Sequence, residues 1–115
     1  DVPAPLLTLY RPSVQPYLMS WFAVVPSEEI RRLKMPVAIF QGDTDIQVAV
    51  SEAQLLAKAQ PTAELHIVRG MNHILKQVPA EMQEQVASYS NPDLSLDPVF
   101  VTPLVQFLKK HFAVK

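Results

Sequence analysis

Glycine is scarce in this chain, which has two glycines in 115 residues, where average usage of about 7% predicts about eight. The two are Gly42 and Gly70, and each comes one residue beyond a short apolar run, after Gln41 and Arg69. An apolar run that stops at a glycine is typical of a buried strand that ends in a turn. The positions of the two glycines therefore carry more information than their low number.

Other absences exclude whole classes of protein. The chain has no cysteine, which excludes a disulfide framework, a thiolate zinc site and a cysteine nucleophile. Ten basic and eleven acidic residues give a net charge of −1, so charge gives no reason to expect a nucleic-acid partner or an anionic membrane surface. No apolar run approaches the roughly 18 residues of a membrane span. Hydrophobic residues make up 49% of the chain, which argues against general disorder.

The chain divides near Leu33 into two segments of different composition. Residues 1–33 are rich in proline and large apolar groups, and we expect them to form a helical segment resembling a cap or lid. Ser13 is expected to cap its first helix, and a second helix is expected to begin near Pro26. We expect residues 34–115 to form the α/β part of the chain.

Three aromatic side chains stand at helical spacing in the first segment: Tyr17, Trp21 and Phe22. They allow two interpretations. One is a lid that lines an acyl pocket, because small-molecule sites are mostly apolar. The other is ordinary packing of a helix face onto a core.

The second segment alternates strands and helices. Residues 37–40 and 65–68 are expected to form strands buried on both faces, and 51–60 a helix that Ser51 caps in a capping box. Further helices are expected over 80–88 and 99–112, separated by a loop with a turn at Asn91-Pro92-Asp93.

This order predicts an α/β fold with two parallel strands, because a helix connects one strand to the next. The carboxyl ends of parallel strands meet at one edge of the sheet, where open α/β sheets place ligand and catalytic groups. Two strands alone are marginal in water. We therefore expect the remainder of a larger core, from the same or another chain, to flank them.

Two side chains follow these strands at the same edge. Asp45 comes shortly after the first predicted strand and His73 shortly after the second. A carboxylate beside an imidazole is the orienting pair of a nucleophilic hydrolase, because the carboxylate accepts the Nδ1 proton and fixes the tautomer. The imidazole then takes a proton from a hydroxyl nucleophile. The pattern predicts catalytic roles for Asp45 and His73.

These segments resemble the C-terminal part of an α/β-hydrolase of the serine hydrolase superfamily. In that family the acid follows the seventh strand in Gly-x-x-Asp, matched by Gly42 to Asp45, and the histidine follows the eighth in Gly-x-x-His, matched by Gly70 to His73. The run Arg11-Pro12-Ser13-Val14-Gln15-Pro16-Tyr17-Leu18 and Gly70-Met71-Asn72-His73 look closest to bacterial esterase-like and serine aminopeptidase-like members. The resemblance covers nearly the whole chain. It implies that Asp45 is the catalytic acid and His73 the catalytic base.

The family's nucleophile elbow, Gly-x-Ser-x-Gly, is absent, and so is its glycine-rich oxyanion segment. None of the serines lies between glycines on a strand-to-helix turn; they are Ser13, Ser20, Ser27, Ser51, Ser88, Ser90 and Ser95. The resemblance therefore implies that the serine lies upstream of residue 1 and that the chain alone does not turn over an ester. It implies no metal and no organic cofactor.

Each candidate residue has an alternative interpretation. Asp45 would otherwise cap the following segment, and His73 would be a solvated loop histidine. Asp43 is the rival acid, one residue after the glycine, and Asp43 with Asp45 also suggests a metal site, although two carboxylates alone seldom hold an ion. His66 in a strand and His111 in the last helix are expected to be structural or solvent-facing. Asn72 is expected to shape the pocket or to serve the turn.

We expect the chain to be part of a serine hydrolase that acts on a small acyl substrate. The bond it cleaves would be an ester, thioester, amide or peptide bond. The alternative is a non-catalytic interaction or structural module that completes its sheet on a partner chain. A third interpretation is an obligate, catalytic complex of two cleaved chains. Nothing in the composition indicates a compartment.

Overall fold

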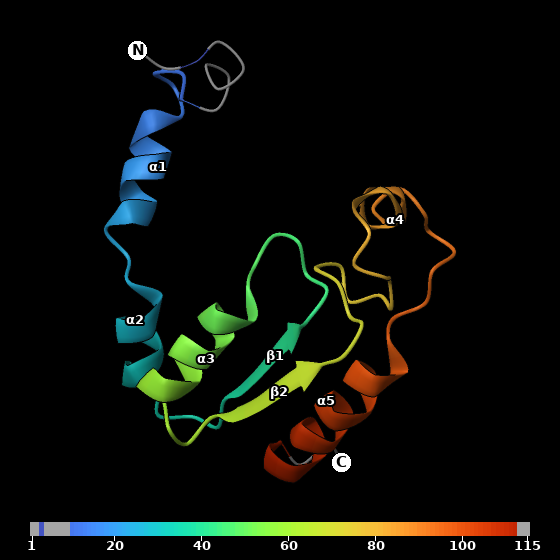
Figure 1. Ribbon diagram of the computed structural model, residues 1–115. Helices are drawn as coiled ribbons and strands as arrows, with labels where there is room; N and C mark the ends of the chain where they lie inside the picture. Colours follow the sequence, from blue (N-terminus) through green and yellow to red (C-terminus); the bar gives the residue numbers. More distant parts are fainter. Residues whose placement is uncertain (1–2, 4–9, 113–115) are drawn as a thin grey trace.

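The computed structural model describes residue 3 and residues 10–112. The ends of the expected cap segment and of the α/β segment, residues 1–2, 4–9 and 113–115, lie outside the described residues. The described elements, in chain order, are α1 (Gln15–Phe22), α2 (Pro26–Arg32), β1 (Ala38–Gly42), α3 (Val50–Ala59), β2 (Glu64–Val68), α4 (Met82–Ser88) and α5 (Pro98–His111) (Figure 1).

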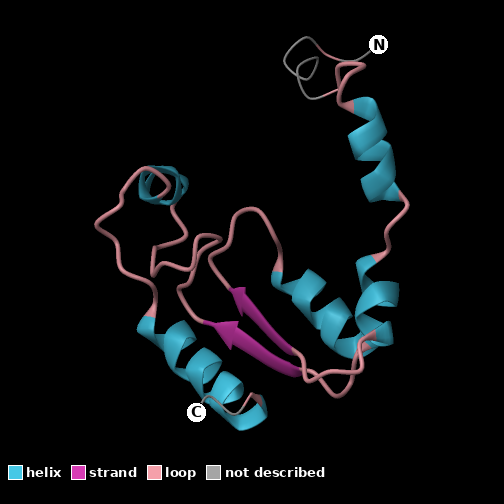
Figure 2. Cartoon of the chain, turned by 180° about the vertical axis from the view of Figure 1, so that it is seen from behind, coloured by secondary structure: helices cyan, strands magenta, loops and turns pink. Residues whose placement is uncertain are grey.

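The two strands pair in parallel, as predicted, with Ala38 opposite Glu64 and Gly42 opposite Val68. Both arrows point the same way in Figure 2, with helices on either side. Over the described residues the chain is thus a mixed helix–strand structure with a two-stranded parallel sheet and five helices, compatible with an α/β fold. The parallel pairing brings the segments that follow β1 and β2 to the same edge.

Helices α3 and α5 lie on opposite sides of the sheet (Figures 1 and 2), and successive side chains of a strand alternate between its two faces. Phe40 of β1 meets Phe100 of α5 edge to face, with ring centroids 5.2 Å apart, and the buried core joins Val68, Met71 and Phe100. Helix α3 contacts both strands and buries Ala53.

Polar contacts hold both ends of α5. Asp97 caps its N-terminus by accepting a hydrogen bond of 2.8 Å from the backbone N–H of Val99. Near the other end, Lys110 donates to the carboxylate of Glu64 in β2 at 2.6 Å. The hydrogen bond and charge of Lys110 hold the pKa of Glu64 below its usual value. The helix continues through Pro103, which lies inside it.

Both expected serine caps are wrong. Helix α1 begins at Gln15 with Val14 at the N-cap, and no side chain bonds there. Helix α3 begins at Val50, so Ser51 lies inside its first turn and Ala49 is the N-cap. Two hydrogen bonds fix Val48 just before the helix: its carbonyl accepts from the amide of Gln41, and its N–H donates to the carboxylate of Asp45. The helix therefore starts one residue earlier than expected.

The other observed helix and strand boundaries differ from the expected ones by a few residues. Strand β1 extends through Gly42 rather than ending at residue 40, and α4 begins at Met82 rather than 80. The expected turn is confirmed, because the N–H of Asp93 donates to the side chain of Asn91 at 3.0 Å. The second helix is confirmed from Pro26, with Glu28 in its first turn.

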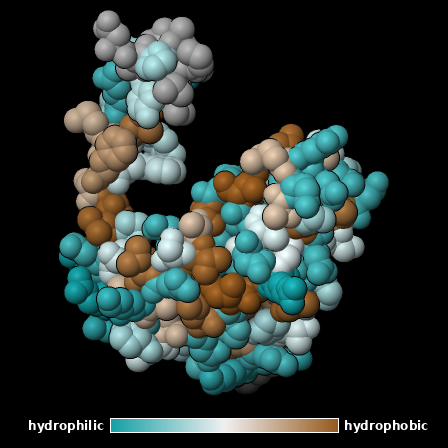
Figure 3. Space-filling model, in the orientation of Figure 1, coloured by the Kyte–Doolittle hydropathy of each residue, from teal (hydrophilic) through white to brown (hydrophobic). Residues whose placement is uncertain are grey.

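The strands are less buried than expected within the described part of the chain. Most residues of β1 and β2 are half-buried, and Ile67 is exposed. Hydrophobic side chains gather on the face turned to the viewer in Figure 3, where Figure 1 shows the strands. A two-stranded sheet leaves the outer edge of each strand without a neighbouring strand. This exposure fits a sheet that further elements would cover.

Helix α1 extends away from the sheet (Figure 1). It buries no residue, and Tyr17, Trp21 and Phe22 are all more than half exposed, so their packing onto a core is not observed in the described residues. The radius of gyration is 17.3 Å, against about 13 Å for a compact chain of this size. Helix α2, in contrast, packs on α3, where the amide of Gln60 donates to the carbonyls of Ile30 and Leu33 at 3.1 and 3.0 Å.

Candidate active site

The segments after β1 and β2 approach each other very closely. A Cβ atom on Gly42 would lie 1.8 Å from the carbonyl oxygen of Met71, so only glycine fits there. The N–H of Asp43 donates to Val68 at 3.2 Å and that of Thr44 to Met71 at 3.3 Å. These bonds continue the contact of the two strands into the loops that carry Asp45 and His73.

Asp43 joins the same two loops. Its carboxylate accepts a bond of 2.6 Å from the backbone N–H of Gly70, and Gly70 has a φ of +77°, a conformation that glycine adopts at little cost. The structure thus places Asp43 on the neighbouring backbone, and it is Asp45 that contacts His73. Among the described residues, no cluster of three or more His, Asp or Glu side chains is arranged to hold a metal ion.

Asp45 and His73 are in direct contact. Nδ1 of His73 lies 3.0 Å from Oδ2 of Asp45, and the side chain of Asp45 is 6% exposed while that of His73 is 39% exposed. The other carboxylate oxygen, Oδ1, accepts backbone N–H bonds from Gln47 at 2.7 Å and Val48 at 3.0 Å. The acid is thus fixed on one side by its own loop and presents its other oxygen to the imidazole.

Burial raises the pKa of Asp45, but the hydrogen bonds lower it more, and the net pKa lies below the ordinary value. The lowering comes first from the N–H groups of Val48 and Gln47, then from His73 and Gln41. Asp45 is therefore ionised at neutral pH. An ionised carboxylate can only accept a hydrogen bond, so it favours the imidazole tautomer in which Nδ1–H donates to Oδ2 and Nε2 is the acceptor.

The histidine loop is held by its neighbour Asn72, which is 1% exposed. Its Oδ1 accepts from the N–H groups of Ile74 at 3.2 Å and Lys76 at 3.1 Å. Its Nδ2 donates to Ser88 of α4 at 2.9 Å. Leu75 adopts a positive φ of 63° and packs against the core of Val68, Met71 and Phe100. Asn72 therefore serves the turn that presents His73.

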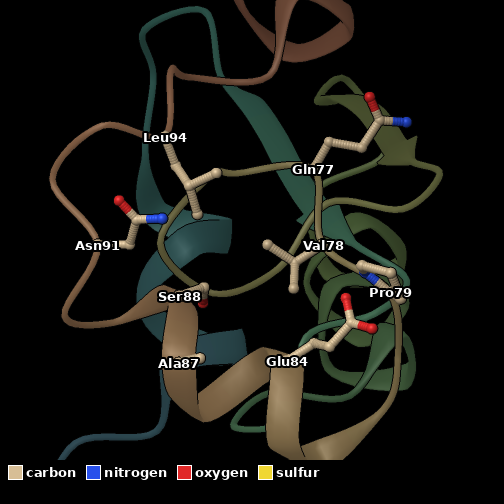
Figure 4. A pocket seen from close by; sticks show the side chains of 8 residues that line it. All are labelled: Gln77, Val78, Pro79, Glu84, Ala87, Ser88, Asn91 and Leu94. Carbon is tan, nitrogen blue, oxygen red and sulfur yellow. The ribbon is translucent and has the colours of Figure 1, made fainter.

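Two cavities lie near this loop. One of about 160 Å³ is lined by both predicted site residues, and its walls include Phe40, Gln41 and Leu75. A larger one of about 250 Å³ lies between residues 77–79, α4 and the loop after it, with Val78, Ser88 and Leu94 in its wall (Figure 4). Neither Asp45 nor His73 lines the larger cavity, so the smaller one is where a reacting group would meet the pair.

The other histidines belong to a different cluster. His66 stacks on Phe40 with centroids 4.7 Å apart, and its Nε2 lies 3.7 Å from Glu64. Nε2 of His111 lies 3.7 Å from the same carboxylate, at the start of β2. Their expected structural role agrees with these contacts.

No serine of the chain forms a hydrogen bond with His73 within the described residues. Ser20, Ser27, Ser51 and Ser88 lie inside helices, and Ser88 bonds to Asn72 and to the carbonyl of Gln85. Nε2 of His73 has no hydrogen-bond partner in the part of the chain that the structure describes. The described site therefore contains a candidate acid and base without a nucleophile.

Two supporting side chains escaped the sequence reasoning. Gln41, at the end of β1, donates to Oδ2 of Asp45 at 3.2 Å. Gln47 donates to the hydroxyl of Tyr89, just beyond α4, at 2.6 Å. Neither Gln41 nor the pair of Gln47 with Tyr89 belongs to a sequence motif, so no signal in the sequence could have identified them.

Searches of protein-family models, curated proteins and solved structures found no match to this chain. No helix among the described residues combines the length and the apolar character needed to cross a bilayer.

Replacing Gly42 with alanine tests the close approach of the two loops. The new Cβ would meet the Met71 carbonyl at 1.8 Å, and backbone cannot move aside cheaply, so we expect the free energy of unfolding to fall by about 3 kcal/mol or more. Gly70→Ala is the matched control, because its Cβ meets only the flexible Gln77 at 3.4 Å and the cost is the positive φ, about 1–2 kcal/mol. Urea unfolding measures both, and equal losses would contradict the close approach.

The lowered pKa of Asp45 makes part of the stability depend on pH. A carboxylate whose pKa is depressed by folding stabilises the fold above its unfolded pKa, and this contribution is lost as pH falls through the folded value. We expect Asp45→Asn to lower the free energy of unfolding at pH 7 by about 2 kcal/mol, and the difference from the parent to narrow below about pH 4.

The exposed Asp93 in the turn after α4 provides the control for this measurement. The stability of Asp93→Asn should follow that of the parent across the same pH range. The role of the ionised carboxylate would be contradicted if the free energies of unfolding of Asp45→Asn and the parent differed by the same amount at pH 7 and at about pH 2.5, which is below the ordinary pKa of an aspartate.

Proposed function

We propose that this chain supplies the acid and the base of a serine hydrolase that cleaves an ester or related acyl bond. The observation that carries the proposal is the 3.0 Å contact between Nδ1 of His73 and Oδ2 of Asp45, whose side chain is 6% exposed, at the carboxyl edge of a parallel strand pair. The resemblance to the Gly-x-x-Asp and Gly-x-x-His segments of the α/β-hydrolases supports the same assignment.

In the proposed reaction a serine from the remainder of the hydrolase core attacks the acyl carbon. Nε2 of His73 takes the serine proton as the serine–acyl bond forms, and then gives it to the leaving group. Asp45 accepts the Nδ1 hydrogen bond throughout and stabilises the imidazolium. In the second half water attacks the acyl carbon, His73 takes the water proton and gives it to the serine oxygen, and the serine–acyl bond breaks to release the carboxylic acid. Backbone N–H groups of the remaining core would hold the oxyanion.

The finer fold assignment belongs to the same proposal. The chain would be the last two strands of an α/β-hydrolase, with α3 and α5 on opposite faces, preceded by a cap-like segment over residues 1–33. Support comes from the parallel pair, from the half-buried strands with open edges, and from the exposed apolar side chains of α1. A lid role for Tyr17, Trp21 and Phe22 would bring apolar surface to an acyl substrate.

A non-catalytic module that completes its sheet on a partner chain is the second candidate. The exposure of Ile67 and the lack of a nucleophile near Nε2 of His73 in the described residues favour it. It differs from the first candidate in requiring neither Asp45 nor His73 for its action.

Substitution of the pair tests the proposed function in the assembled hydrolase, meaning this chain together with the portion that carries the serine. We expect Asp45→Asn to lower kcat for a short p-nitrophenyl ester about 10⁴-fold, because the amide donates to Nδ1 and imposes the wrong tautomer. His73→Ala should lose at least about 10³-fold.

The matched control is His111→Ala, which removes a histidine that also contacts a carboxylate. We expect it to retain activity within about threefold, since surface substitutions away from a site change little. Ester turnover near the parent level in either Asp45→Asn or His73→Ala would remove that residue from the mechanism. Full activity in both would leave the module as the better account.

A further inference from the structure

The side-chain amide of Gln41 occupies the inside of the loop that carries the acid. Gln41 is 8% exposed, and its Nε2 faces three oxygens: the carbonyls of Gly42 and Val48, both at 3.0 Å, and Oδ2 of Asp45 at 3.2 Å. All three are acceptors, so the amide must present its NH₂ group to them. One side chain thus joins the beginning, middle and end of the loop.

The contact with Asp45 falls on the oxygen that also meets the imidazole. Oδ2 receives Gln41 and lies 3.0 Å from Nδ1 of His73, while Oδ1 receives the N–H groups of Gln47 and Val48. The carboxylate is therefore bonded on every side, and it cannot rotate about its last bond without breaking contacts. Loss of the Gln41 contact would leave the contact with His73 as the only one on Oδ2 among the described residues.

We propose that Gln41 is a positioning residue that holds Oδ2 of Asp45 against Nδ1 of His73. This role rests on the proposed function for its effect on catalysis. Its effect on the acid and on the imidazole tautomer is independent of any turnover. Gln41 touches neither the reacting atoms nor the nucleophile, and it acts only through Asp45.

Two substitutions remove the amide donor of Gln41 in different ways. Gln41→Met keeps the length of the side chain and removes both N–H donors. Gln41→Glu keeps the shape and places a carboxylate beside Asp45, where like charges repel. Both should raise the pKa of Asp45, and glutamate should raise it more than methionine, because a bond that favours the charged form is lost.

Gln60→Met is the matched control. Gln60 is also buried, at 9% exposure, and its Nε2 also donates to two backbone carbonyls, but those belong to Ile30 and Leu33, away from the acid loop. It should cost stability in the same way as Gln41→Met, and it should leave the titration of Asp45 unchanged. A purely structural role for Gln41 would make the two methionine variants behave alike.

The test combines NMR and kinetics on the assembled hydrolase. The carboxyl ¹³C signal of Asp45 reports its titration, the ring ¹⁵N signals of His73 report its tautomer, and ester hydrolysis reports kcat/KM. We expect Gln41→Met to raise the Asp45 midpoint, to weaken the preference for Nδ1–H, and to lower kcat/KM about tenfold to 100-fold, with Gln60→Met close to the parent in all three.

Each outcome is decisive. If Gln41→Met leaves the Asp45 titration and the His73 tautomer as in the parent, the positioning role is wrong whatever happens to the rate. If both NMR signals change but ester hydrolysis does not, the positioning role stands and the proposed function fails. If Gln41→Met does not fold, Gln41→Glu gives the same readouts, and an unchanged titration there overturns the proposal.

Discussion

The candidate site depends on how closely the loop after β1 passes the loop after β2. Where the strand pairing ends, the Cα of Gly42 lies against the carbonyl of Met71, and a Cβ would overlap it at 1.8 Å. The N–H of Thr44 reaches the same carbonyl, and the carboxylate of Asp43 binds the N–H of Gly70. These contacts bring two loops far apart in sequence to a single edge. The side chains they carry, Asp45 and His73, then meet at that edge.

Because the two loops lie so close together, the carboxylate of Asp45 is contacted on both of its oxygens. The backbone of its own loop holds one oxygen of Asp45, and Gln41 and His73 share the other. The histidine is fixed in turn by Asn72, which ties its loop to α4 through Ser88, and by Leu75, which accepts a positive φ to reach the core. The same contacts that close the loops therefore also orient and ionise the candidate acid.

Sequence reasoning reached the parts that depend on local pattern. Apolar runs that stop at Gly42 and Gly70 located both strands, and the helix between them made the pair parallel, so the meeting of Asp45 with His73 followed from topology. The expected cap at Ser51 is wrong because hydrogen bonds specific to the shape of the acid loop fix where α3 starts. Gln41 and Tyr89 could not be found because their partners are set only by the folded loops. The strands are less buried than predicted, because an apolar sequence shows that a strand can be buried but does not show which elements pack against it.

The proposed function requires that His73, oriented by Asp45, activates a serine outside these 115 residues. A fluorophosphonate reacts covalently with such an activated serine, and peptide mass mapping identifies the modified residue. In the assembled hydrolase we expect a single modified serine outside these 115 residues, with labelling at least about 100-fold slower in His73→Ala. Modification of a serine within the chain, or labelling that His73→Ala leaves unchanged, would contradict it.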